Sequence, residues 1–122
     1  MSGFLRRAVA RLTEDDDVVA SRELRDEREQ VGATAVTSCT HGEPVCVAGT
    51  LRAVTLRPRA GAPTLEAELF DGTGTVTLIW LGRRRIGGVE CGRSLTARGR
   101  LTEHEGRPTI YNAAYELRPP VG

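Results

Sequence analysis

The sequence predicts a mainly β fold, in which a short N-terminal helical leader precedes a small closed barrel of five strands. Before Gly32 the residues follow helical spacing or are nearly all charged, whereas after Gly32 apolar and polar residues alternate with a period of two. Five alternating segments follow one another, separated by glycine-containing turns and loops. The 122 residues, 39% of them hydrophobic, suffice for one core but not for two domains of ordinary size.

The leader is expected to cover residues 1–32 and to contain two stretches of different character. Apolar residues of the first stretch recur at helical spacing: Phe4, Leu5, Ala8, Val9 and Leu12. They predict a short amphipathic helix, whose apolar stripe either packs on the barrel or contacts a partner protein. Residues 14–17 are acidic and break this pattern, and residues 21–30 are almost all charged, with both signs, which predicts a solvated helix or a partly ordered segment.

The barrel is expected to cover residues 33–122. Its strands are predicted at residues 45–57, 64–70, 75–81, 94–102 and 108–117. The first strand is long and contains Gly49, and its apolar residues change parity after Leu51. This change predicts a β-bulge near Arg52 and Ala53. A long, bent first strand can join both halves of the sheet, as a small closed barrel requires.

The connections between the strands narrow the architecture. Asp71 to Gly74 predicts a tight hairpin between the second and third strands, and residues 103–107 predict another between the fourth and fifth. Residues 82–93 form the one connection long enough for a crossover. This order matches a five-stranded OB-type β-barrel, the oligonucleotide/oligosaccharide-binding architecture. An SH3-like barrel or a flat meander is the competing architecture.

Three stretches carry a resemblance to a known family. They are Phe70 to Trp80 (FDGTGTVTLIW), Cys91 to Arg100 (CGRSLTARGR) and Ile110 to Glu116 (IYNAAYE). These stretches resemble strands two to five of OB domains, and within roughly residues 43–118 the chain is similar to the wedge domain of RecG-type branched-DNA helicases. It also resembles small stand-alone OB-fold proteins of actinobacteria. The resemblance implies the OB fold and nucleic-acid binding, but no unwinding activity, because the motor domains are absent.

The chain departs from the family in one position of the fifth strand, where Ala113 stands in place of a frequent Pro. The charge distribution is uneven as well. The formal net charge is +1 and all 17 basic residues are Arg, yet the acidic leader is followed by a mildly basic barrel. Guanidinium groups bind phosphate through paired hydrogen bonds and stack on bases. A GC-rich coding bias would produce the same arginine content without any functional meaning.

An OB barrel binds single strands across strands two and three, between the 1–2 and 4–5 loops. Such binding needs cations along the path of the backbone and aromatic faces for the bases. The predicted nucleic-acid-binding residues are Arg52, Arg57, Arg59, Phe70, Thr77, Ile79, Arg83, Arg84, Arg85, Arg107 and Tyr111. The arginines at 83–85 are the strongest local indication of phosphate contact, because three consecutive guanidinium groups cannot all be buried. Generic solubilising charge is the alternative interpretation.

Strand parity separates the aromatic residues. Trp80 shares the parity of Val76 and Leu78, which predicts a core position, whereas Phe70 is expected on the outer face as the better stacking candidate. Glu66 and Glu68 share the parity of Phe70. If they lie on the binding face they repel phosphate, and the site is then narrower or displaced towards residues 83–85.

Neither catalysis nor a bound metal or cofactor is expected. The two histidines, His41 and His104, fall in predicted loops without a triad or an acid–base pattern, and no phosphate-binding Gly-rich loop is present. Four residues could in principle bind zinc: Cys39, His41, Cys46 and Cys91. They lack the paired C-x-x-C spacing, so reduced, isolated thiols are expected.

The sequence therefore predicts a non-enzymatic binder of single-stranded or branched DNA, with RNA as a further possible ligand and with weak sequence preference. No signal peptide and no apolar run of about 20 residues is recognisable, which predicts a cytoplasmic protein without membrane contact. The alternative is a protein-interaction module that uses the barrel as a scaffold and the N-terminal helix as its contact.

Overall fold

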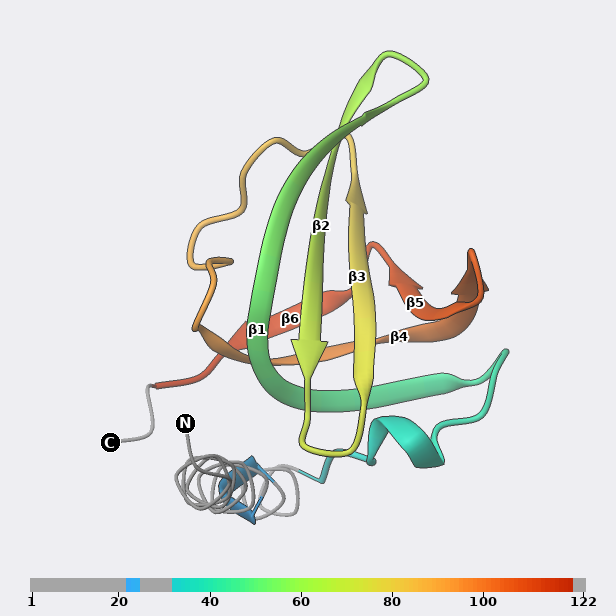
Figure 1. Ribbon diagram of the computed structural model, residues 1–122, viewed down its shortest axis with the longest axis vertical. Coiled ribbons are helices and arrows are strands. Elements are labelled where there is room, and N and C mark those ends of the chain that lie inside the picture. Colours follow the sequence, from blue (N-terminus) through green and yellow to red (C-terminus); the bar gives the residue numbers. More distant parts are fainter. Residues whose placement is uncertain (1–21, 25–31, 120–122) are drawn as a thin grey trace, which may run out of the picture.

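A computed structural model describes residues 22–24 and 32–119 of the chain. Its elements are η1 (Val36–Ser38), β1 (Pro44–Arg59), β2 (Ala62–Phe70), β3 (Thr75–Leu81), β4 (Ser94–His104), β5 (Arg107–Tyr111) and β6 (Ala114–Leu117) (Figure 1). Residues 22–24 are helical. The predicted amphipathic helix and most of the charged stretch lie outside the described residues, so the proposed division at residue 32 stays a prediction.

The six strands form one sheet in the order β1-β2-β3-β5-β4-β6, and β1 also pairs with β4, so that five strands close a ring. Strand β1 makes this closure possible because its first half, from Pro44 to Thr50, pairs with β4 and its second half, to Arg59, pairs with β2. Figure 1 shows β1 curving around the ring between these two partners. The mainly β prediction is confirmed.

Two features shape the bend of β1. The register with β2 shifts between Leu51 and Ala53, which confirms the predicted bulge at Arg52. Gly49 precedes the bulge, and a Cβ atom at this position would lie 2.2 Å from the carbonyl oxygen of Phe70. Only glycine allows so close an approach of the two backbones.

The predicted fifth strand, 108–117, is wrong as one continuous element. It divides into β5 and β6 at Asn112, which has a positive φ of 49°. The backbone N–H of Asn112 donates to Ile79 O over 2.6 Å, and its side-chain Oδ1 accepts from Leu81 N over 3.0 Å. These bonds end β5 beside β3, and the chain then turns so that β6 pairs with the first part of β4.

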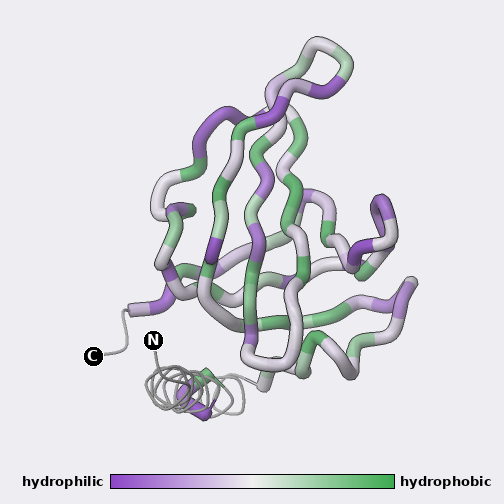
Figure 2. Tube along the Cα trace, viewed as in Figure 1, coloured by the Kyte–Doolittle hydropathy of each residue, from purple (hydrophilic) through white to green (hydrophobic). Residues whose placement is uncertain are grey.

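The core lies inside the ring. Side chains that are almost completely buried come from every strand of the ring, among them Leu51, Leu69, Leu78, Leu95 and Ile110. Trp80 is a core residue as predicted, 5% exposed, and its indole N–H donates to Ala113 O over 3.0 Å. Figure 2 shows the resulting alternation of hydrophobic and hydrophilic residues along the strands.

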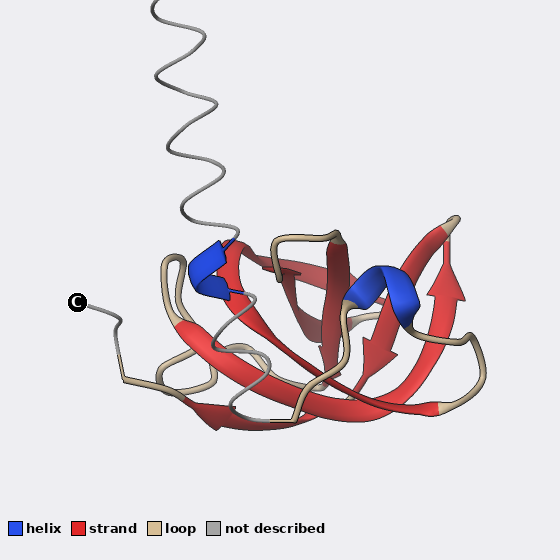
Figure 3. Cartoon of the chain, turned by 90° about the horizontal axis from the view of Figure 1, so that it is seen from below, coloured by secondary structure: helices blue, strands red, loops and turns tan. Residues whose placement is uncertain are grey.

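Elements outside the strands cover the ring. Ile86 and Val89, from the long 82–93 connection, are buried in the same core cluster, and so is Val36 of η1. Seen from below, η1 lies across the strands of the ring (Figure 3). Its anchor is Asp71, which is fully buried and accepts the Val36 N–H over 2.7 Å.

Asp71 also organises the hairpin that follows it. Its Oδ1 atom accepts the backbone N–H of Thr73 over 2.8 Å, the Thr73 hydroxyl over 2.6 Å and the N–H of Gly74 over 3.0 Å. The hairpin was predicted, but the bond from Asp71 to η1 was not, because it joins residues 35 positions apart.

Candidate nucleic-acid interface

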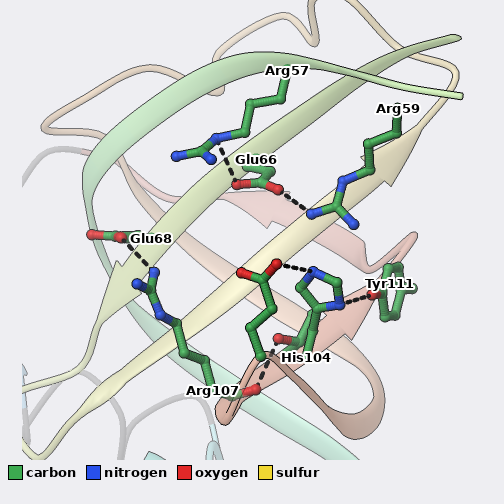
Figure 4. A network of polar contacts seen from close by, with 9 residues as sticks. Arg57, Arg59, Glu66, Glu68, His104, Arg107 and Tyr111 are labelled. Atoms are coloured by element: carbon green, nitrogen blue, oxygen red, sulfur yellow. Dashed lines mark hydrogen bonds and ion pairs between the residues drawn. The ribbon is translucent and has the colours of Figure 1, made fainter. Parts of the chain in front are cut away.

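One outer face of the ring carries most of the predicted site. In its centre the register aligns Glu66 of β2 with Ile79 of β3, and Ile79 with Tyr111 of β5. In the next row Glu68 lies opposite Thr77, and Thr77 lies opposite Thr109. Arg57 and Arg59 extend this face on β1, and Arg107 borders it from the β4–β5 hairpin (Figure 4). We call this surface the outer face.

The arginines of the outer face are paired with glutamates. The Glu66 carboxylate lies between Arg57 Nε, at 3.3 Å, and Arg59 Nη2, at 2.6 Å (Figure 4). Arg107 Nη1 lies 3.9 Å from Glu68 Oε1. The hydrogen bond to Glu66 raises the pKa of Arg59, so this guanidinium carries its charge at any physiological pH. The predicted cations are therefore present, but two carboxylates neutralise much of their charge.

Between these pairs lies a small pocket of about 100 Å³. Its lining is polar apart from Ile79: Arg57, Arg59, Glu66, Thr77, Ile79, His104, Glu105, Arg107 and Thr109. Ile79 is 0% exposed but lies outside the core cluster, because it is in register with Glu66 and Tyr111 on the outer side of the ring. It forms the floor of the pocket, and a ligand would reach it only after the polar side chains of the lining move.

Tyr111 and His104 form a further contact beside this pocket. The Tyr111 hydroxyl lies 3.0 Å from His104 Nδ1, and the two rings are arranged edge to face (Figure 4). His104 Nε2 is buried without a hydrogen-bond partner in the described residues, 3.7 Å from Glu105 Oε1. His104 was not among the predicted site residues, because only the pairing of β4 with β5 brings it beside Tyr111.

The predicted stacking residue Phe70 lies at the far end of β2 and is half-buried. The guanidinium carbon of Arg52 lies 3.5 Å from the centre of its ring. Two predicted site residues therefore contact each other, and the Arg52 guanidinium covers one face of the Phe70 ring.

The arginines at 83–85 lie in the connection between β3 and β4, which we call the arginine loop (residues 82–93). All three are exposed, and Figure 2 shows this hydrophilic stretch beyond the end of β3. Within residues 22–24 and 32–119, no hydrogen bond or ion pair involves their side chains. Because Ile86 and Val89 are buried, the loop is anchored directly after the three charges.

The residues considered for zinc do not converge. Cys39 and His41 line a pocket of about 510 Å³ beside η1, whereas the Cys91 thiol donates to Arg52 O over 3.2 Å. Burial raises the pKa of the Cys39 thiol, and the charges of Asp71 and Cys46 raise it further. In the part of the chain that the structure describes, no three His, Cys, Asp or Glu residues are grouped as metal ligands.

Comparison with known proteins yields a similarity of fold but no match of sequence to a family. No protein-family model matches the chain, and no curated protein matches its sequence. Among solved structures, the fold is similar to RecG bound to a three-way DNA junction, with a TM-score of 0.54 and 25% sequence identity. The match covers 67% of this chain and 12% of the RecG chain.

The chain thus corresponds to a small part of the RecG protein that it matches, and the likeness concerns a RecG-like domain. Among the described residues, no helix is both long and apolar enough to cross a membrane.

Proposed function

We propose that the ring of five strands is an OB-type barrel that binds single-stranded or branched DNA, with weak sequence preference and without catalysis. The observation that carries the proposal is the similarity to RecG, whose solved structure contains a three-way DNA junction. The resemblance of residues 43–118 to the wedge domain of these helicases, read from the sequence, points to the same ligand. RNA is the second nucleic acid to be tested, and we expect the protein to act in the cytoplasm.

The arrangement of the arginines supports this function. The outer face spans β2 and β3 between the β1–β2 and β4–β5 hairpins, which is where OB barrels bind single strands. A phosphate could replace Glu68 as the partner of Arg107 at small cost, because exposed ion pairs contribute only about 0–1 kcal/mol each. The arginine loop offers further cations that have no acid to displace.

The first test is fluorescence anisotropy with labelled single-stranded DNA, single-stranded RNA and a forked DNA duplex, each at several salt concentrations. We expect binding that weakens with salt, with a logarithmic slope of about −0.7 for each single-strand phosphate that is neutralised. We also expect the forked duplex to bind at least as tightly as the single strand. If none of the three ligands binds at low salt, the proposed function is wrong.

One observation favours a second candidate, a protein-interaction module. Glu66 and Glu68 neutralise the arginines of the outer face, which therefore attracts phosphate less than its arginine content suggests. In that case the N-terminal leader is the expected contact. Deletion of residues 1–30 separates the two candidates, because a nucleic-acid site on the barrel survives the deletion and a protein site on the leader is lost.

A further inference from the structure

Arg52 owes its position to the β-bulge in β1. The register with β2 passes from Leu51 opposite Leu69 to Ala53 opposite Glu68, so Arg52 has no partner across the strand. A bulge residue leaves the regular alternation, and its side chain is re-aimed. Here the backbone of the bulge is held by the turn before β4, because Leu51 N donates to Arg93 O over 2.9 Å and Gly92 N donates to Leu51 O over 2.7 Å.

The re-aimed side chain lies over Phe70. With its guanidinium carbon 3.5 Å from the ring centre, Arg52 is in van der Waals contact with the aromatic face. The arginine is nevertheless exposed. Within the described residues its guanidinium has no carboxylate partner, unlike those of Arg57, Arg59 and Arg107. One side of the guanidinium is thus covered by the ring, and the exposure of the residue leaves the group accessible to a ligand.

Planar guanidinium groups and aromatic rings both stack on nucleobases in single-stranded complexes. We propose that Arg52 and Phe70 together form a stacking platform for one nucleobase of a bound single strand. The base stacks on the guanidinium, which the ring beneath holds in place, and the positive charge lies beside the strand's phosphates. This inference rests on the proposed function and adds a base subsite to it.

The platform lies at one end of the outer face. Phe70 has the same parity on β2 as Glu66 and Glu68 and is opposite Thr75 of β3. Arg59, opposite Ala62, lies at the other end of the same strand pair. The eight residue steps from 62 to 70 correspond to about 26 Å at about 3.3 Å per residue, a length that suits a bound strand of several nucleotides. A base subsite at one end would fix the position of the bound nucleic-acid strand along this face.

The test uses the full chain and thymidine oligonucleotides that carry a single 2-aminopurine at successive positions, since the fluorescence of this base is quenched by stacking. For the wild-type protein we expect quenching confined to one position or a short window. Arg52→Lys keeps the charge but removes the plane, so we expect the quenching to be lost. We expect the Kd to rise about 5- to 10-fold with an unchanged salt slope.

Phe70→Leu is the second variant, because it keeps an apolar side chain beneath Arg52 but removes the ring, and we expect it to weaken the quenching as well. Arg98→Lys is the matched control, since Arg98 is an exposed arginine on β4, and it should leave both the Kd and the quenching unchanged. Thermal unfolding of each variant shows whether it folds. If Phe70→Leu does not fold, Arg52→Lys still decides the matter.

Two failures can be told apart. If the wild-type protein binds none of the oligonucleotides, and neither the RNA nor the forked duplex of the first test, the proposed function is overturned and the platform with it. If it binds only the forked duplex or the RNA, the platform alone is overturned. If the wild-type protein binds with the expected salt dependence, the platform alone is overturned by either of two results. One is the absence of quenching at every position, and the other is an Arg52→Lys variant that quenches and binds like the wild type.

Discussion

The outer face and the arginine loop carry the same type of side chain in different electrostatic settings. On the outer face Arg57, Arg59 and Arg107 lie within ion-pair distance of Glu66 or Glu68. In the arginine loop, residues 83–85 are exposed and, among the described residues, are paired with no acid. The number of arginines therefore overstates the positive electrostatic potential of the outer face. It does not overstate that of the three arginines in the arginine loop.

This difference suggests a division of labour in nucleic-acid binding. Unpaired, exposed charges attract a polyanion over about 8 Å at physiological salt, so the arginine loop is expected to dominate the salt-dependent attraction. Arginines that pair with glutamate bind a phosphate only when the phosphate replaces the carboxylate. The outer face is therefore expected to orient the bound nucleic-acid strand more than to attract it. The following variants test this comparison, from the largest expected effect to the smallest.

Asp71→Ala should have the largest effect, because it removes a part of the scaffold on which both regions depend. The fully buried carboxylate accepts backbone N–H groups of Val36, Thr73 and Gly74. Leaving such donors unpaired costs about 1–3 kcal/mol each. We expect urea denaturation to show a loss of at least about 3 kcal/mol of stability. A variant as stable as the wild type would contradict the structural role assigned to Asp71.

Simultaneous replacement of the three arginines at 83–85 by Ser should cause the largest loss of binding without loss of stability. If each contacts a phosphate, the logarithmic salt slope for single-stranded DNA becomes shallower by about 2, and the affinity at low salt falls at least about tenfold. Anisotropy titrations measure both quantities. Arg84→Ser and Arg98→Ser form a matched pair, and equal effects of the two would mean that the loop acts only through net charge.

Glu66→Gln should leave Arg57 and Arg59 on the outer face without a carboxylate partner, like the arginines of the arginine loop. The substitution removes the carboxylate that pairs with Arg57 and Arg59. We expect single-stranded DNA to bind about 3- to 5-fold more tightly at low salt, with a slope steeper by about 0.7. Glu116→Gln, at an exposed position on β6, is the control for net charge. Weaker binding of the Glu66 variant would instead show that the carboxylate is needed to position the arginines.

Tyr111→Phe should have the smallest effect. It removes the contact between the tyrosine hydroxyl and His104 Nδ1 but keeps the ring. A hydrogen bond of this kind contributes about 0.5–1.5 kcal/mol to stability, and we expect a loss in that range by urea denaturation. The affinity for DNA should change less than about twofold, since stacking depends on the ring. A larger loss of affinity would place the hydroxyl in direct contact with the ligand.

Much of this arrangement could be predicted from local patterns. Alternation located the strands, the change of parity in β1 located the bulge at Arg52, and the parity of Trp80 placed it in the core. The break at Asn112 could not be predicted in this way, because it depends on hydrogen bonds to Ile79 and Leu81 on another strand. His104 was missed for the same reason, since its neighbour Tyr111 becomes its partner only when the hairpin closes.

The sequence by itself determined which side chains lie on which face of each strand, because successive residues of a strand point to opposite sides. It also determined that arginine is the only basic residue available to a ligand. Only the tertiary structure decided which charges meet. The register of β1 with β2 brings Glu66 between Arg57 and Arg59, the bulge directs Arg52 onto Phe70, and the burial of Ile86 and Val89 anchors three arginines that pair with no described acid. Electrostatic and stacking contacts act over a few ångströms, and those distances are set by the register and curvature of paired strands rather than by the alternation within any one strand.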